Sequence, residues 1–522
     1  MNYIDYSIVL LYFATMIWLG MRFKKSKAAT DYFLGSKQFG WFSLCMSAMA
    51  TQLSAVSFVS APAFVGLRKG GGMQWLTFEF GVPIAMIIII TVISPLLYRS
   101  GVVSVYGYLE KRFNRSSKLL LSAVFLISRC FATAVIIYAV GLILSSIIGI
   151  PLWQTMLILG GITIIYSLEG GMKAIVYSEV AQMIIKLLGI ITIIICGLYY
   201  LGGWDVFVQH VDHNRLRVVD IGNFGFDGRE YGFWPMLLGG IFLYCSYYGT
   251  DQTQAQRILS AKDERTAGKM LLFNGLLRFP ITLAYCFGGL VLGVFVARNP
   301  AFAARIPAEK PDLMIPVFIT DYLPHGVTGI IVISIIAAGM SAYSSTLNSL
   351  SAVTMEDFIA PRITMSKERY VTASKLTALF WGVLTMILSF YVSGIARTII
   401  EAINKIGSMF YGPILAMFLL AMLTRNVKAK AANAGLITGV LVNLLLWIFF
   451  KNVFWFWWNV IGCLTTLLVA STITLLAGTT NKQELSKESV TNRFQLVTPQ
   501  TIILLIFFIC MISFSILLPY LF

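Results

Sequence analysis

The chain has 522 residues, of which 58% are hydrophobic and only 12% are charged, and its mean hydropathy is +0.81. Soluble domains are about 45–50% apolar and about 25% charged, so this composition excludes an ordinary soluble protein. The formal net charge of +16 comes from Lys and Arg clusters in alternate short loops, which indicates the cytoplasmic bias of a membrane protein and not a nucleic-acid-binding surface.

Apolar runs of roughly 20 residues recur along the whole chain and predict transmembrane helices. Runs such as PIAMIIIITVISPLL (83–97) do not alternate between apolar and polar residues, which argues against a β-barrel. We therefore predict an all-α polytopic membrane protein. Fourteen spans fit the pattern, at residues 6–21, 42–66, 74–97, 119–148, 151–167, 175–201, 234–254, 268–296, 326–352, 371–393, 401–423, 432–450, 453–477 and 500–521.

The first span is preceded by Asp5 and followed by the basic cluster RFKKSK (22–27). This order is the reverse of a signal peptide, so we expect a retained helix with the N-terminus outside. Every basic cluster then lies inside. We expect a multi-pass protein of the plasma (inner) membrane, surrounded by the lipid bilayer.

The second and seventh spans are interrupted by polar residues, with Thr51, Gln52 and Ser54 in the second and Ser246 and Gly249 in the seventh. These two spans open successive blocks of five spans. Such matching interruptions are typical of an inverted-repeat transporter with broken helices at its binding site, whereas ordinary helix packing is the alternative. We predict one transmembrane domain, 1–522, with a leading helix, a first repeat, a second repeat and C-terminal helices at 6–21, 42–201, 234–423 and 432–521.

The ninth span carries a stripe of hydroxyl groups, because Ser341, Ser344, Ser345 and Ser349 follow one another at i, i+3, i+4 and i+8 on one helical face. One or two such serines would simply bond back to their own helix. A stripe that faces a broken helix suits a sodium ion, which takes about five or six oxygen ligands from hydroxyls and freed carbonyls. The stripe therefore indicates a sodium site.

Three motifs resemble the sodium/solute symporter family. YSLEGGMKAIVYSEVAQ (166–182) resembles the family signature, and NKIGSMFYGPILAMFLLAMLT (404–424) resembles its eleventh helix. SSTLNSLSAVTMEDF (344–358) resembles the ninth helix of the iodide, multivitamin and monocarboxylate branch. The resemblance covers about residues 5–450 and extends to the galactose and sialic acid transporters of the family. It implies a LeuT-like fold of two inverted five-helix repeats, and sodium-driven import by alternating access.

The resemblance also implies a sodium site made by four residues: the backbone carbonyls of Ala50, Leu53 and Ala338 and the hydroxyl of Ser341. The family usually has a second hydroxyl residue next to this serine. Here Ala342 stands in that position, which removes one ligand. Some members have a second sodium site, whose ligands match Ser344, Ser345 and Glu179.

The positions that the resemblance assigns to the solute differ from those of a galactose site. Tyr247 matches the tyrosine that closes the site in galactose-transporting members, with a packed aromatic side chain as the alternative. Ser57 and Tyr244 stand where those members bind the sugar with other residues, and Glu79 lies near the height of another sugar contact. Galactose specificity is therefore not implied.

Arg129 lies inside the fourth span, where a charged side chain costs at least about 2.5–3.5 kcal/mol. A guanidinium fits a substrate carboxylate through two hydrogen bonds, and sialic acid transporters of the family bind a carboxylate through an arginine on this helix. The alternative is a structural arginine that reaches the interface or pairs with Glu179. Arg278 in the eighth span has the same two interpretations.

We predict a sodium-coupled symporter that imports a small organic solute, and in particular an organic anion such as a sugar acid, a monocarboxylate or an acidic vitamin. A sodium symporter for a neutral hexose, and a solute channel or sensor without coupling, are the alternatives. The sequence has no Ser/His/Asp, HExxH or nucleotide-loop motif, so we expect no enzyme activity. We expect no cofactor besides the co-transported sodium ion, no nucleic acid and no obligate protein partner.

Overall fold

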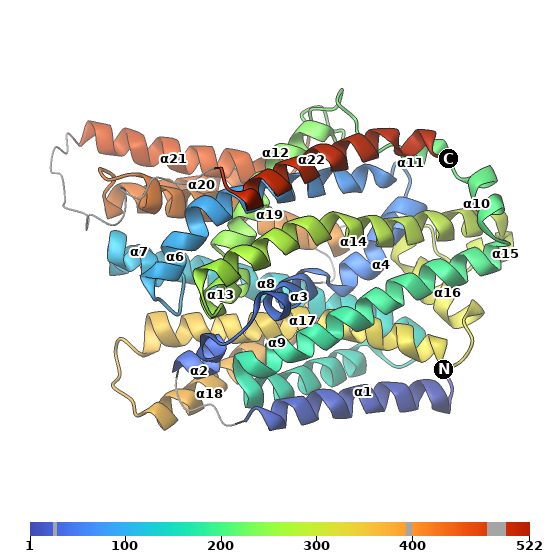
Figure 1. Ribbon diagram of the computed structural model, residues 1–522, viewed down its shortest axis with the longest axis horizontal. Helices are drawn as coiled ribbons and strands as arrows, with labels where there is room; N and C mark the ends of the chain where they lie inside the picture. The colour runs from blue at the N-terminus through green and yellow to red at the C-terminus, as the bar shows by residue number, and fades with distance from the viewer. Residues whose placement is uncertain (25–28, 393–398, 478–496) are drawn as a thin grey trace.

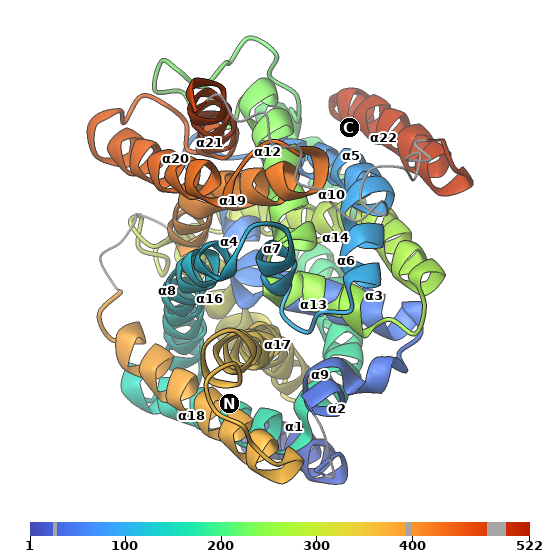
Figure 2. The ribbon, with the colours of Figure 1, turned by 90° about the vertical axis from the view of Figure 1, so that its left-hand side faces the viewer.

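The computed structural model describes residues 1–24, 29–392, 399–477 and 497–522. Within these ranges the chain is helical, and its single β-type pairing is an isolated bridge between Phe39 and Ala261. The long helices run along one common axis and form an elongated bundle (Figure 1), which Figure 2 shows from one end. The predicted all-α class is confirmed.

The first half of the bundle consists of α1 (Tyr3–Arg22), α2 (Ala29–Leu34), α3 (Trp41–Gln52), α4 (Ala55–Gly66), α5 (Gly81–Ile88), α6 (Ser94–Ser100), α7 (Gly107–Arg112), α8 (Arg115–Ile148) and α9 (Leu152–Leu201). The second half consists of α12 (Phe233–Gly249), α13 (Gln252–Ser260), α14 (Glu264–Arg298), α16 (Met314–Tyr322), α17 (Val327–Val353), α18 (Lys367–Ser389), α19 (Ile399–Leu423), α20 (Ala429–Phe449), α21 (Trp457–Leu476) and α22 (Pro499–Leu517). Polar side chains accept hydrogen bonds from the first backbone N–H groups of several helices, at Asn2, Asn114, Asp251, Asp263 and Ser366.

The helix α9 is 50 residues long and is not one straight span. A straight α-helix of that length would measure about 75 Å, more than twice the ~30 Å hydrocarbon core of a bilayer. Gly171 breaks it with a non-helical backbone (φ 53°, ψ −153°), and a Cβ there would lie 2.7 Å from the carbonyl oxygen of Tyr32. The predicted spans 151–167 and 175–201 are the two arms on either side of this turn.

Both predicted helix interruptions are confirmed. The helices α3 and α4 are separated at Leu53 and Ser54 and bend by 58°. The helices α12 and α13 are separated at Thr250 and Asp251. A broken helix leaves backbone carbonyl and N–H groups without partners in the helix, so each break is a polar point inside the bundle.

Among the described residues, eleven helices are long and apolar enough to cross a membrane, or up to twelve if the bent pair of α3 and α4 is one span. The predicted count of fourteen spans differs from this number for two reasons. It divides α9 at Gly171, and it includes α12, which has only 17 residues. The count of fourteen therefore stays a prediction.

The helix α17 is the central element of the bundle. It is surrounded by α8, α9 and α18 (Figure 2), and every residue from Ser334 to Val353 is buried. Since its hydroxyl stripe lies within this buried stretch, the stripe faces protein and not lipid. The polar groups of α17 are thus available to the neighbouring broken helix α3.

The helices α4 and α14 approach each other closely through three glycines. A Cβ at Gly66 would lie 2.1 Å from the carbonyl oxygen of Gly289, and one at Gly293 would lie 2.5 Å from the carbonyl oxygen of Gly66. Small residues four positions apart are the usual means of bringing membrane helices together. This contact fixes α4, which is one half of the broken helix, against α14.

We predict that Gly66→Val destabilises the protein by at least about 1–3 kcal/mol, since the added carbons must push α14 away. Thermal unfolding in detergent measures this as a lower melting temperature. The matched control is Gly161→Val, because a Cβ at Gly161 meets no atom within 4 Å. Equal melting temperatures for the two variants would show that the α4–α14 contact does not depend on its glycines.

Candidate functional site

The break after α3 is occupied by a lysine side chain. Lys186 extends from α9, is fully buried, and donates hydrogen bonds to the carbonyl oxygens of Ala50 (2.6 Å) and Leu53 (2.9 Å). It also donates to the hydroxyl of Ser341 on α17, at 2.7 Å. The ammonium thus satisfies carbonyl groups that the break in α3 leaves without helical partners.

The structure therefore brings together the residues expected to form the main sodium site. Ser341 Oγ lies 2.8 Å from the carbonyl oxygen of Ala50 and 3.2 Å from that of Ala338. Lys186 was not among the predicted site residues, although a lysine within the apolar run of the sixth span was a signal. An intramembrane lysine is energetically costly unless protein groups or water solvate it, so its position alone indicates a functional role.

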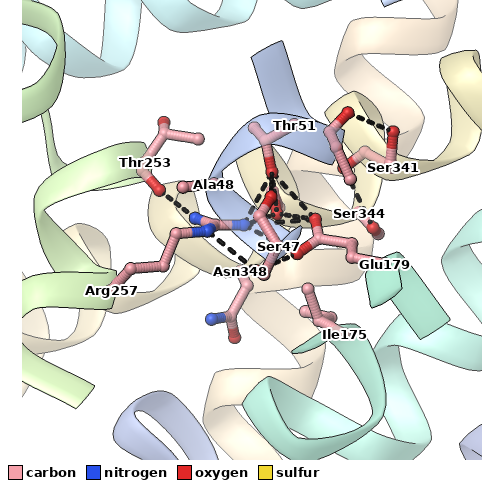
Figure 3. Close-up of polar contacts among 12 residues, drawn as sticks. Ser47, Ala48, Thr51, Ile175, Glu179, Thr253, Arg257, Ser341, Ser344 and Asn348 are labelled. Atoms are coloured by element: carbon pink, nitrogen blue, oxygen red, sulfur yellow. Dashed lines mark hydrogen bonds and ion pairs between the residues drawn. The ribbon is translucent and has the colours of Figure 1, made fainter. Parts of the chain in front are cut away.

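A second polar cluster lies beside the first and contains Glu179 (Figure 3). Arg257 on α13 pairs with it through Nη2, which lies 2.9 Å from one carboxylate oxygen and 3.1 Å from the other. Thr51 donates to the same carboxylate at 2.9 Å, and Ser47 and Ser345 also donate to it. Both charged side chains are buried, so α3, α9, α13 and α17 are joined by one charge-assisted network.

Of the three residues expected at a second sodium site, the structure brings two together. Ser345 and Glu179 share the network with Arg257, whereas Ser344 donates back to the carbonyl oxygen of Ser341, at 3.2 Å. A guanidinium thus holds the acid that the resemblance assigned to sodium. The alternative pairing of Glu179 with Arg129 is wrong, since each has a different partner.

A cavity of about 120 Å³ lies next to both breaks. Four of the five residues expected to bind the solute line this cavity, namely Ser57, Arg129, Tyr244 and Tyr247. The fifth, Glu79, does not line it. Arg278, Trp75, Phe78 and Tyr411 also line it. The cavity therefore combines aromatic faces with two guanidinium groups, in a site bounded by α4, α8, α12, α14 and α19.

Arg129 is paired with an acid at the second break. Its Nε lies 2.6 Å from one carboxylate oxygen of Asp251. The other carboxylate oxygen accepts a hydrogen bond from the backbone N–H of Thr253, so Asp251 caps α13. Its Nη2 donates to the hydroxyl of Tyr411 at 2.7 Å. The guanidinium carbon lies 5.1 Å and 5.4 Å from the ring centres of Tyr247 and Tyr411, which is cation–π distance.

Arg278 is held in the same manner by Glu79. The guanidinium lies 3.0–3.1 Å from the carboxylate oxygens, which also accept hydrogen bonds from Tyr244 (3.0 Å) and Thr282 (2.9 Å). Glu79 is fully buried, so it organises this wall of the cavity without lining it. Each arginine of the cavity thus has one acidic partner, and the two pairs contribute no net charge.

The described residues contain no group of three or more His, Cys, Asp or Glu side chains that could hold a metal ion. The oxygen groups at the break after α3 suit a monovalent cation, and the cavity suits a small polar solute with an apolar or planar part. This pairing of a cation position with a solute cavity at two broken helices is the arrangement of secondary transporters.

Known proteins resemble this chain in both sequence and structure. The family model described as "Sodium:solute symporter family" matches residues 32–439. The sodium-coupled monocarboxylate transporter 2 of Bos taurus is 30% identical over 440 residues, which are 82% of this chain and 69% of the relative. The human sodium/iodide cotransporter is 29% identical over 434 residues, which are 82% of this chain and 66% of that protein.

The putative sodium-dependent multivitamin transporter of Drosophila melanogaster is 28% identical over 455 residues, 83% of this chain and 73% of the relative. Among solved structures, a sodium-coupled sialic acid symporter in a substrate-bound, outward-open state has a TM-score of 0.83 at 23% identity, over 91% of this chain and 98% of its own. This likeness concerns the fold. The resemblance found in the sequence motifs is confirmed, and the relatives are transporters and not enzymes. The chain belongs to the sodium:solute symporter family.

Proposed function

We propose that this protein is a sodium-coupled symporter that imports a small organic solute by alternating access. The observation that carries the proposal is the cavity at two broken helices, with a group of backbone and hydroxyl oxygens directly beside it. Family membership supports sodium as the coupling ion. The main site would use Ala50, Leu53, Ala338 and Ser341, which the structure brings together.

The proposed topology has fourteen spans and an outside N-terminus. The two chain ends lie at the same end of the bundle (Figure 1), which supports an even number of crossings. The basic helix α7 lies at the opposite end, and positive charges favour the cytoplasmic side. We assign 42–201 and 234–423 to two inverted repeats, each opening with a broken helix, in a protein of the plasma (inner) membrane.

The proposed solute is a small organic anion. Relatives of this chain carry monocarboxylates, iodide and vitamins according to their names, and two guanidinium groups line the cavity. The contacts of Arg129 with Asp251 and Tyr411 use Nε and Nη2, so Nη1 is the donor left for a carboxylate among the described residues. Tyr247 and Tyr411 hold this guanidinium in place for planar recognition.

A neutral solute is the second candidate, and one observation favours it. Both arginines already have a carboxylate partner, so the cavity offers hydrogen-bond donors without excess positive charge. A hexose would use the same donors, the aromatic faces and Ser57. Comparison of an acid with its neutral amide separates the two candidates. Accumulation against a gradient, driven by sodium, separates a symporter from a channel or sensor.

We predict that the wild-type protein in vesicles takes up an organic acid at least about tenfold better than its amide, since a charge-assisted hydrogen bond contributes roughly 1.5–3 kcal/mol. The charge-balanced double variant Arg129→Gln with Asp251→Asn should lose this preference while keeping its fold. Asp251→Asn alone is the control that keeps the guanidinium.

Competition of acid and amide against a labelled acid measures the preference. A preference that survives in the double variant would exclude Arg129 as the carboxylate partner. Equal uptake of a neutral sugar and of any acid by the wild type would replace the anion with the hexose.

We also predict that Glu179→Gln lowers stability by about 3–5 kcal/mol, because it leaves the buried guanidinium of Arg257 without its charge partner. Arg257→Gln added to it should recover most of this loss, as measured by thermal unfolding. The control is Arg99→Gln in an exposed pair with Glu264, where the side chains are 53% and 39% exposed and the loss should stay below about 1 kcal/mol.

The double variant also tests the link to coupling. We expect its half-saturation for sodium to change more than its half-saturation for the solute, since Glu179 contacts the oxygen groups of α3 and α17 and does not line the cavity. A change in solute affinity alone would place Glu179 in solute recognition instead.

A further inference from the structure

Lys186 stands where the coupling sodium ion is expected. Its Nζ contacts Ala50, Leu53 and Ser341, which are three of the four residues assigned to that ion. The ammonium has three N–H donors, and these three oxygen acceptors at 2.6–2.9 Å match them. Lys186 thus has the same surroundings that a bound sodium ion would have.

The position of Lys186 in its helix excludes an ammonium group that extends along the helix to the water at either end. It lies 15 residues from Gly171 and 15 from Leu201, so each end of this arm is about 22 Å away along the helix. A lysine side chain is much shorter than that. The backbone beside it is fixed to α17, where Ser334 donates to the carbonyl oxygen of Ile185 at 2.9 Å. The amine is therefore directed to the break in α3.

Among the described residues, Lys186 forms no ion pair with an acidic side chain. Glu179, two turns earlier on the same helix, is bound by Arg257. The ammonium is stabilised by carbonyl and hydroxyl dipoles, which is how a protein also solvates sodium.

The substitution at Ala342 agrees with this occupant. Sodium takes about five or six oxygen ligands, whereas an ammonium needs one acceptor for each of its three N–H groups. A site with the hydroxyl of Ser341 and two carbonyl groups is complete for the ammonium. The missing hydroxyl at Ala342 would be a loss for sodium alone.

We propose that Lys186 is a tethered competitor of the coupling sodium ion, so that the main site holds either the Lys186 ammonium or a sodium ion and never both. Two positive charges cannot share one set of oxygen atoms. For sodium to enter, the Lys186 side chain has to move away from the oxygen atoms of Ala50, Leu53 and Ser341. This inference rests on the proposed sodium-coupled function.

Binding of radioactive sodium to the purified full-length protein tests this inference without any solute. Lys186→Met should bind sodium at least tenfold more tightly than the wild type, because the variant has no ammonium that contacts the oxygen atoms of the site. Ser341→Ala added to Lys186→Met should remove this binding, whereas Lys173→Met on the first turn of the same arm should behave as the wild type.

The outcomes are distinct. Sodium binding of equal affinity in the wild type and in Lys186→Met would overturn the inference, as would a lack of sodium binding in both proteins. A wild type without sodium binding and a Lys186→Met variant with it would support it. If Lys186→Met does not fold, Lys186→Gln, which keeps a polar side chain without the charge, takes its place in the same measurement. Failure of solute uptake in both proteins would count against the proposed function and would leave the sodium result valid.

Discussion

The break between α3 and α4 is the constraint on which the rest of the site depends. It frees carbonyl groups in the middle of an apolar bundle, where an unsatisfied polar group costs several kcal/mol. A cationic group satisfies these carbonyl groups effectively, because several oxygen atoms can contact it at the same time. The neighbouring helices supply what the break needs: α17 its hydroxyl groups, α9 its ammonium, and α13 the guanidinium that secures the adjacent acid.

The buried charges form a consistent pattern around this break. Arg257, Arg129 and Arg278 each face one carboxylate, on different helices. Such pairs add little net stability, because desolvation of the two charges offsets most of their attraction. Their value is positional: each one ties helices that are distant in the sequence, and α13 joins two of the pairs through Asp251 and Arg257. Lys186 is the exception to this pattern, since a group of dipoles takes the place of its acid.

Much of this arrangement could be predicted from the sequence. Apolar runs of the right length predicted the helices, and the polar interruptions at Thr51 and Ser246 predicted both breaks. The resemblance assigned Ala50, Leu53 and Ser341 to one site, and they do meet. The partners of the buried charges were not predictable, because Arg129 and Asp251 are 122 residues apart and no periodicity relates them. Lys186 was missed for another reason: the resemblance assigns only the ligands of an ion, and the contact of Lys186 with these ligands follows from the fold.

The separation of these partners along the chain has a consequence for biosynthesis. Glu179 leaves the ribosome 78 residues before Arg257, and Lys186 precedes Ser341 by 155 residues. At about 5–20 residues per second, the lysine waits roughly 8–30 s for its hydroxyl partner. During this time each lone charge costs about 2.5–3.5 kcal/mol in a helix surrounded by lipid. The second arm of α9 therefore gains its full stability in the bilayer only after the second half of the chain has been inserted beside it.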